Sequence, residues 1–198
     1  MSSENLHTQT KILNAALNLL QQGPAAKTRM SDIAKAAGIS RQAVYLHYPS
    51  RADLMIAAAR HLDQVKEVDA RLADSRAATS GAQRLRSFID AWGHFMPEIW
   101  GLAKAFLAMR ETDEAAAAAW DDRMQAVRHG CQAAVSALDQ DDQLSSAVTV
   151  KQGTDLLWAL LSIETWRRLT HDCGWSQAAY IDHITRLAEV ALLNRGSL

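Results

Sequence analysis

Apolar residues recur at helical spacing along almost the whole chain. Near its beginning, residues three and four positions apart fall on one face of a helix expected over about 6–22: Ile12, Leu13, Ala16, Leu17 and Leu20. Alternating runs of β-branched residues are absent, and Ala, Leu, Gln, Arg and Glu dominate the chain. The pattern predicts an all-α fold.

The same spacing predicts about nine helices in two lobes. After the first helix, the expected helices cover about 29–36, 40–48, 51 to the low 70s, 83–96, 98–109, 113–138, 149–172 and 176–194. Three prolines, Pro24, Pro49 and Pro97, fall between these segments, as expected of a residue that interrupts helices. Residues 74–82, DSRAATSGA, are the best candidate for a linker.

Residues 30–54 have the pattern of a helix-turn-helix followed by a third helix. Ile33, Ala34 and Ala37 form the buried face of the first helix of the pair. Gly38 can supply the positive φ that the tight turn requires, and Ser40 stands where the second helix needs its N-cap. Such a unit places side chains in the major groove of DNA.

The second helix of this pair carries the predicted base contacts. Val44 and Tyr48 point inward, which leaves Arg41, Gln42 and Tyr45 on the outer face. Arginine can bridge guanine O6 and N7, and glutamine can bridge adenine N6 and N7. For Tyr45, packing against the preceding helix is the alternative. The predicted phosphate contacts are Thr28, Arg29, Lys35, His47 and Arg51.

The run DIAKAAGISRQAVYLHYPSRADL, residues 32–54, resembles the DNA-binding segment of the TetR family of bacterial transcription regulators. The resemblance covers about the first quarter of the chain, and it departs from the usual pattern at Ser31 and Arg51, where many members carry Arg and Lys. It implies a helix-turn-helix DNA-binding domain over 1–50. It also implies a helical effector-binding and dimerisation domain over 51–198, in which 51–73 is the connecting helix.

Charge is distributed unevenly although the net charge is only −1. Residues 1–60 carry seven Lys and Arg against three acidic residues, a net +4, and the remainder carries fourteen against nineteen, a net −5. Basic charge therefore gathers where phosphates would be bound, whereas an architectural DNA protein would be basic throughout. No secretory signal or long apolar run is visible, so we expect a cytoplasmic protein without a membrane span.

Large aromatic and methionine side chains after residue 80 suggest an effector pocket. All six tryptophans lie outside the DNA-binding segment, and rigid rings with adaptable methionines suit an apolar cavity, although such stripes also form ordinary cores. Glu164 continues an apolar row and is expected to be partly buried, where it would pair with Arg167 or Arg168, face a second subunit or meet the effector. The predicted pocket comprises Phe88, Trp92, Phe95, Met96, Trp100, Phe106, Met109, Trp120, Met124, Trp158 and Glu164.

The last two expected helices are apolar on more than one face. A helix on a monomer surface needs a single apolar stripe, so the extra width suggests a two-fold dimer. The family resemblance implies the same pair of helices. The predicted interface comprises Leu157, Leu161, Ile181, Ile184, Ala188 and Leu192.

No motif indicates catalysis, a cofactor or a metal. The chain has no GxSxG or HExxH sequence and no phosphate-binding glycine loop, and adjacent residues His171, Asp172 and Cys173 on a helix end would point in different directions. Cys131 and Cys173 are expected to be idle thiols. The predicted function is a homodimeric, sequence-specific transcription regulator, a repressor released from a near-palindromic operator by a small, largely apolar effector. A ligand-dependent activator and a helical ligand-binding protein without operator specificity remain alternatives.

Overall fold

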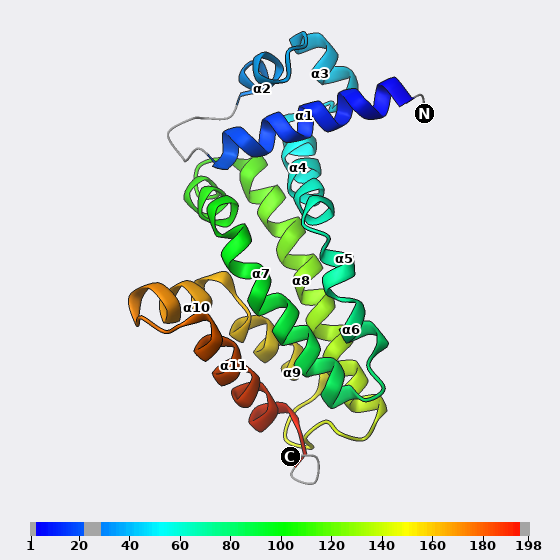
Figure 1. The fold of residues 1–198 in the computed structure, drawn as a ribbon, viewed down its shortest axis with the longest axis vertical. Helices are drawn as coiled ribbons and strands as arrows, with labels where there is room; N and C mark the ends of the chain where they lie inside the picture. The colour runs from blue at the N-terminus through cyan, green and yellow to red at the C-terminus, as the bar shows by residue number, and fades with distance from the viewer. Residues whose placement is uncertain (1–2, 22–28, 195–198) are drawn as a thin grey trace. The chain divides into compact units, whose positions relative to one another are not determined.

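The computed structural model describes residues 3–21 and 29–194, and the regular elements within them are all helical, which confirms the all-α prediction. Eleven α-helices and one π-helical segment are described, against about nine helices expected (Figure 1). In chain order they are α1 (Ser3–Gln21), α2 (Met30–Ala37), α3 (Arg41–His47), α4 (Arg51–Val65), α5 (Val68–Arg71), α6 (Ala73–Ala77), α7 (Gly81–Met109), α8 (Glu114–Gln140), α9 (Val150–Leu160), α10 (Ile163–Arg167), η1 (Arg168–Asp172) and α11 (Gln177–Leu192).

The chain divides into two compact units. Unit 1 comprises Met1–Glu67 and Trp100–Met124, and unit 2 comprises Val68–Ile99 and Gln125–Leu198. Both α7 and α8 run from one unit into the other. The functional division expected after residue 50 stays a prediction, since α4 belongs to the same unit as the helices before it.

Unit 1 is built on the predicted apolar faces of its first four helices. Ile12 and Ala16 of α1 are buried, as are Ile33 of α2, Val44 of α3 and Leu54 of α4. Helix α1 crosses α4 and lies beside α2 (Figure 1). The Nε2 atom of His61 on α4 lies 3.0 Å from Oδ1 of Asn14 on α1, a polar contact at the rim of this core.

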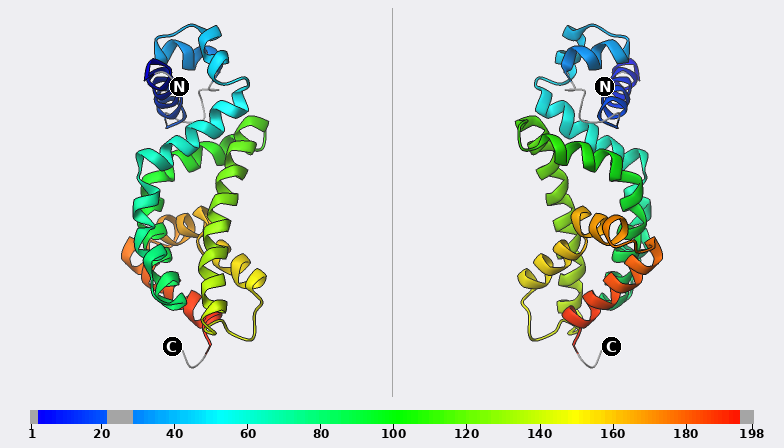
Figure 2. Two further views of the ribbon diagram at one scale, coloured as in Figure 1. Left: turned by 90° about the vertical axis from the view of Figure 1, so that its right-hand side faces the viewer. Right: turned by 90° about the vertical axis from the view of Figure 1, so that its left-hand side faces the viewer.

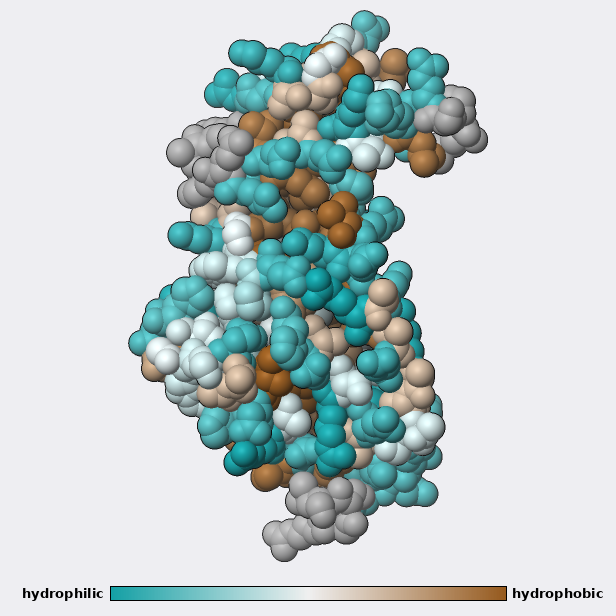
Figure 3. Space-filling model, viewed as in Figure 1, coloured by the Kyte–Doolittle hydropathy of each residue, from teal (hydrophilic) through white to brown (hydrophobic). Residues whose placement is uncertain are grey.

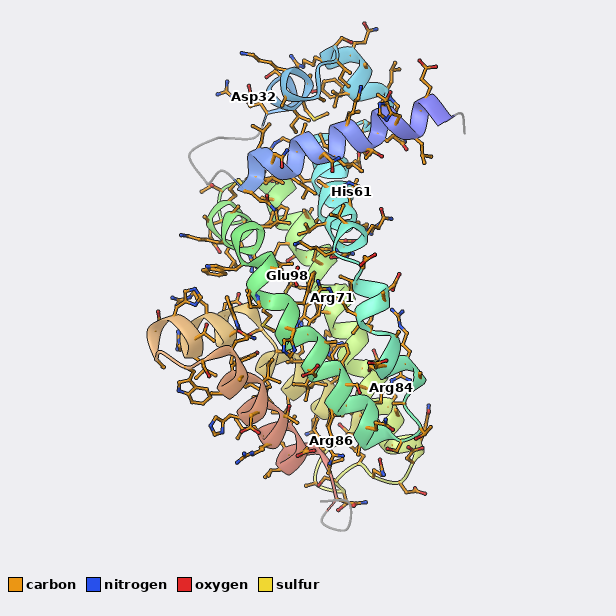
Figure 4. The ribbon with its side chains drawn as sticks, in the orientation of Figure 1. Asp32, His61, Arg71, Arg84, Arg86 and Glu98 are labelled. Atoms are coloured by element: carbon orange, nitrogen blue, oxygen red, sulfur yellow. The ribbon has the colours of Figure 1, made fainter. Side chains whose placement is uncertain are left out.

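The connecting helix ends earlier than expected. Instead of continuing into the low 70s, α4 stops at Val65, and Glu67 adopts φ +53° in the left-handed region. An α-helix cannot continue through such a residue, so the segment splits into α4, α5 and α6. Part of the expected linker over 74–82 is helical as a result, because α6 covers Ala73–Ala77. In unit 2, Nη2 of Arg71 on α5 lies 2.8 Å from Oε1 of Glu98 on α7 (Figure 4).

Pro97 does not divide the next helix, so the expectation of separate helices over 83–96 and 98–109 is wrong. Helix α7 runs unbroken through Pro97 from Gly81 to Met109. A proline inside a helix leaves the carbonyl four residues earlier without its backbone donor. Here that carbonyl belongs to Gly93, and it accepts a hydrogen bond of 2.7 Å from Nε2 of Gln177 on α11. A distant side chain therefore replaces the bond that proline cannot make.

The expected helix over 149–172 is also divided, into α9, α10 and the π-helical segment η1. Ser162 begins a new helix, because its Oγ accepts a hydrogen bond of 3.1 Å from the backbone N–H of Thr165. At the end of unit 2, α11 returns to the chain that follows α8, and the N–H of Ser145 donates to the carbonyl of Leu192 over 2.7 Å (Figure 2). This closes a core that includes Leu85, Leu138, Leu157, Tyr180 and Ile184.

Candidate nucleic-acid interface

The turn between α2 and α3 has the predicted geometry. Gly38 adopts φ +68° and ψ +32°, a left-handed conformation that ends α2. Ser40 caps α3, and its Oγ accepts a hydrogen bond of 3.0 Å from the N–H of Ala43. At the start of α2, a carboxylate oxygen of Asp32 accepts a hydrogen bond of 3.3 Å from the N–H of Arg29 (Figure 4). Across the turn, the N–H of Ile39 donates to the carbonyl of Ala34 over 3.0 Å, and this bond and the Ser40 cap fix how α3 leaves α2.

Helix α3 presents one face to the core and the other to solvent. Val44 is fully buried, and Tyr48 is half-buried, which raises the pKa of its phenol. Arg41 and Gln42 are exposed, as predicted for base contacts. On the face drawn in Figure 3, hydrophilic residues predominate over α1 to α3, with apolar residues emerging between them.

Arg41 and Tyr45 form a pair along the outer face of α3. A guanidinium nitrogen of Arg41, Nη2, donates a hydrogen bond of 3.3 Å to the Tyr45 hydroxyl, and Cζ lies 5.4 Å from the centre of the tyrosine ring. The hydrogen bond raises the pKa of Arg41 further above its usual range. Tyr45 is 39% exposed, so part of its ring is accessible to a ligand beside the Arg41 guanidinium that it orients.

Leu46 is a residue of this face that the sequence analysis missed. Its side chain is 81% exposed, the most open of the large apolar residues among those that the structure describes. Helical periodicity could have found it, because Leu46 is two residues from the inward Val44 and therefore lies almost opposite to it.

The residues predicted to contact phosphates differ in their exposure and in their partners. Arg29 and Lys35 are exposed and His47 is half-buried, whereas Thr28 lies outside the described residues. Arg51 is paired within unit 1, because its Nη1 atom lies 2.6 Å from both carboxylate oxygens of Asp113, at the start of α8. The two side chains are only 25% and 23% exposed, and the phosphate contact of Arg51 stays a prediction that would require this ion pair to open.

A hollow of about 450 Å³ lies beside this ion pair. Its lining combines the pair itself with the end of α7 and the turn into α8: Arg51, Ala108, Met109, Thr112, Asp113, Glu114 and Ala115. Of the residues predicted for the effector pocket, Met109 alone lines this hollow.

Further ion pairs join α4 to the first part of α8 within unit 1. Nε of Arg60 donates to Oδ2 of Asp122 over 3.1 Å, and Arg123 bonds to Asp63. Arg123 also binds Asp122, with Nη2 and Oδ2 2.8 Å apart. The hydrogen bond from Arg60, opposed by partial burial and supported by Arg123, lowers the pKa of Asp122.

The substitution Asp122→Asn should therefore reveal a pH-dependent contribution to stability. Because the pKa of Asp122 is lower in the folded chain, its contribution is complete above about pH 4 and disappears as the pH falls through the folded value. At pH 7 we expect Asp122→Asn to reduce the free energy of unfolding by about 1 kcal/mol, since Arg60 is largely solvated. The difference between the variant and the parent should be smaller in thermal unfolding at pH 2.5 than at pH 7. The exposed neighbour provides the control: Asp121→Asn should unfold like the parent at both pH values.

The residues predicted for an effector pocket are distributed over both units. Phe88, Trp92, Phe95, Met96 and Trp158 belong to unit 2, whereas Trp100, Phe106, Met109, Trp120 and Met124 belong to unit 1. In unit 2, the indole N–H of Trp92 donates to the carbonyl of Leu161 over 3.3 Å, and the Arg128 guanidinium lies 6.0 Å from the ring centre of Trp158. Glu164 is exposed, so the expectation that it would be partly buried is wrong.

The residues predicted for the dimer interface are mostly interior. Leu157, Leu161, Ile184, Ala188 and Leu192 are at most 1% exposed within the single chain, and Ile181 is half-buried. Side chains already buried in the chain cannot contribute surface to a second copy. The exposed apolar residues of α9 and α11 are others: Leu156, Leu187 and Val190.

The described residues include neither a metal-binding cluster nor a membrane-spanning helix. Within 3–21 and 29–194, no three His, Cys, Asp or Glu side chains gather as a metal site requires. No helix in those ranges has the length and apolarity needed to cross a bilayer. Cys131 is buried, which raises the pKa of its thiol to about 12, and Cys173 is exposed.

Comparison with known proteins places the similarity where the helix-turn-helix lies. The sequence model of the bacterial regulatory proteins of the tetR family matches residues 12–58. The transcriptional repressor LfrR of Mycolicibacterium smegmatis is 40% identical over 67 residues, which is 34% of each chain. The transcriptional regulator EthR of Mycobacterium tuberculosis is 32% identical over 115 residues, 58% of this chain and 53% of EthR. The chain thus spans about a third to a half of the length of these curated relatives.

Solved structures extend the likeness in fold to nearly the whole chain. A TetR-family regulator from Rhodococcus has a TM-score of 0.73 at 19% identity, covering 93% of this chain and 98% of its own. A transcriptional regulator from Saccharomonospora viridis, solved in complex with choline, has a TM-score of 0.71 at 18% identity, covering 96% and 99%. At these identities the likeness concerns the fold.

Proposed function

Since the chain belongs to the TetR family, and is therefore a DNA-binding transcription regulator rather than an enzyme, we propose that it is a repressor that binds a near-palindromic operator as a homodimer. The observation that carries the proposal is the outer face of α3. A capped, rigidly joined helix exposes Arg41, Gln42 and Tyr45 within the segment that the family model matches.

The chemistry of this face fits base edges in a major groove. Arg41 would bridge O6 and N7 of a guanine, and Gln42 would bridge N6 and N7 of an adenine. The contact with Tyr45 restrains the arginine side chain before binding, which reduces the entropy lost when it docks. Arg29, Lys35 and His47 would bind phosphates on either side and so fix the register.

Selection from random duplex DNA followed by titration tests the proposed specificity. We expect the chain to enrich one near-palindromic sequence and to bind it at least 1,000-fold more tightly than random duplex at physiological salt. Equal binding to all sequences would support an architectural role instead, and no binding would leave a ligand-binding protein. A reporter gene placed behind the selected operator then separates repression from ligand-dependent activation.

We infer that the dimer forms through the surfaces of α9 and α11. The buried row of α11 faces its own chain, while Leu187 and Val190, three residues apart, lie outside that row and are 53% and 72% exposed. Leu156 of α9 is also exposed. Apolar side chains left open on two neighbouring helices suit an isologous contact, in which each copy covers the other.

The double substitution Leu187→Asp with Val190→Asp should separate the subunits. Each dimer would have to bury four unpaired carboxylates, so we expect the dimer dissociation constant to rise at least 100-fold. Sedimentation velocity measures the change, and operator affinity should fall with it. Val65→Asp, at an exposed apolar position on α4, should leave the dimer intact. A parent protein that sediments as a monomer while fully occupying its operator would contradict the dimer.

We also propose that a small, largely apolar effector releases the operator. The support is the supply of aromatic and methionine side chains in both units and the ion pairs that tie α4 to α8, because α4 directly follows the DNA-binding helices. An effector acts only if it prefers the conformation that does not bind DNA. A thermal-shift screen of apolar compounds, with each hit then titrated into the operator complex, tests this. If no stabilising compound changes operator affinity, the effector proposal fails.

A further inference from the structure

The outer face of α3 is not uniformly polar. At about 100° per residue, Gln42 and Leu46 each lie about 160° from the buried Val44, and so they occupy the centre of the exposed face. Arg41 and Tyr45 form the neighbouring row. A leucine that is 81% exposed thus stands at the middle of the surface that faces outward.

An exposed leucine at this position has few partners on DNA. It has no hydrogen-bonding atom for phosphates or for the polar edges of bases. The thymine C5-methyl group is the apolar group that a base edge presents in the major groove. The surroundings of Leu46 favour DNA over an apolar protein partner, because the same helix carries Arg41 and His47 and Lys35 lies exposed on the helix before it.

We propose that Leu46 is a specificity-determining residue that reads a thymine through its C5-methyl group. This inference rests on the proposed operator binding and adds to it a base contact made without a hydrogen bond. Gln42 and Leu46 are four residues apart, about 6 Å along the helix axis. Base pairs are stacked about 3.4 Å apart, so the thymine lies within about two base-pair steps of the adenine proposed for Gln42.

Replacing single thymines by uracil in the selected operator tests the methyl contact directly, because uracil lacks only that methyl group. For the parent protein, one thymine in each half-site should be sensitive, and its replacement should weaken binding about fourfold. That change corresponds to about 0.8 kcal/mol for one buried methyl group. In Leu46→Ala the uracil and thymine operators should bind equally. Leu46→Met keeps an apolar side chain, so we expect the sensitivity to remain.

These measurements form a double-mutant cycle between the Leu46 side chain and the thymine methyl group. A purely structural role of Leu46 would not couple the two changes. Val65→Ala, at another exposed apolar position, should keep the full uracil effect. Leu46 is exposed, so its variants should melt like the parent. Suppose that the parent selects an operator but Leu46→Ala abolishes the effect of uracil at none of its thymines. The proposed contact between Leu46 and a thymine methyl group would then be wrong. If the parent selects no operator at all, the proposed function itself is overturned.

Discussion

Replacing Arg41 by alanine is expected to lower operator affinity by roughly 10- to 100-fold for each half-site. A bidentate contact between arginine and guanine contributes about 1–3 kcal/mol of discrimination, and alanine cannot replace either hydrogen bond. Because a symmetric dimer uses Arg41 twice, the loss applies to both half-sites. Fluorescence anisotropy on the selected operator measures it. Selection with the variant should recover sites in which the guanine preference is relaxed.

Two controls separate base contact from general charge. Lys35→Ala should weaken binding to all sequences about equally and reduce the slope of affinity against salt by about two, about one for each of the two phosphate contacts that the dimer loses. Arg76→Ala removes an exposed arginine of α6 that pairs with Asp69 in unit 2, and it should leave operator affinity unchanged. Equal operator affinity for Arg41→Ala and the parent would refute the assignment of Arg41.

The largest loss of stability is expected for Gly81→Ala, at the start of α7. A Cβ atom at this position would lie 2.6 Å from the carbonyl oxygen of Ala137 on α8, and backbone cannot move aside as a flexible side chain can. Overpacking of this kind costs about 1–3 kcal/mol. For a chain of this size, the melting temperature should fall by roughly 2–12 °C, measured by circular dichroism.

A second glycine-to-alanine substitution on α7, at Gly101, is expected to stabilise the chain. At Gly101 of α7, an added Cβ would meet no atom within 4 Å. Gly101→Ala therefore only improves helix propensity, and we expect a gain of about 0.5–1 kcal/mol. If both variants destabilised the chain equally, the close approach of α7 and α8 at Gly81 would be refuted.

Sequence predicted the DNA-binding helices well because the signals there are local. Gly38 and Ser40 define a turn and a cap through the backbone of their own neighbours, and Val44 marks the buried side of α3. The outer face follows from the buried one by periodicity alone. Leu46 has no side-chain atom that donates or accepts a hydrogen bond, so its residue type does not indicate a DNA contact.

Beyond α3, the errors come from partners far away in the chain. The ion pair of Arg51 with Asp113, 62 residues later, was not expected because it leaves no pattern in the sequence. The break after α4 falls at Glu67. This residue is neither glycine nor proline, so its type does not indicate the end of a helix. Glu164 appeared to continue an apolar row, but the row ends because Ser162 restarts the helix.

Five of the residues predicted for the dimer interface are buried within the single chain for a related reason. A helix that is apolar on several faces can be covered by its own chain or by a second copy, and sequence does not separate the two. In α11 the most regular row, Tyr180, Ile184, Ala188 and Leu192, packs inside the chain. The less regular positions remain exposed, and they carry the proposed contact.

The side-chain amide of Gln177 has two neighbours, and each uses a different end of it. Its oxygen accepts from the indole N–H of Trp166 over 2.8 Å, while its nitrogen donates to the carbonyl that Pro97 leaves without a backbone donor. Without a proline at position 97, the Gly93 carbonyl would accept the usual hydrogen bond from the backbone N–H of residue 97. Without glutamine at position 177, it would lack its present side-chain donor. Across related sequences, therefore, Pro97 and Gln177 should covary as a pair although 80 positions separate them.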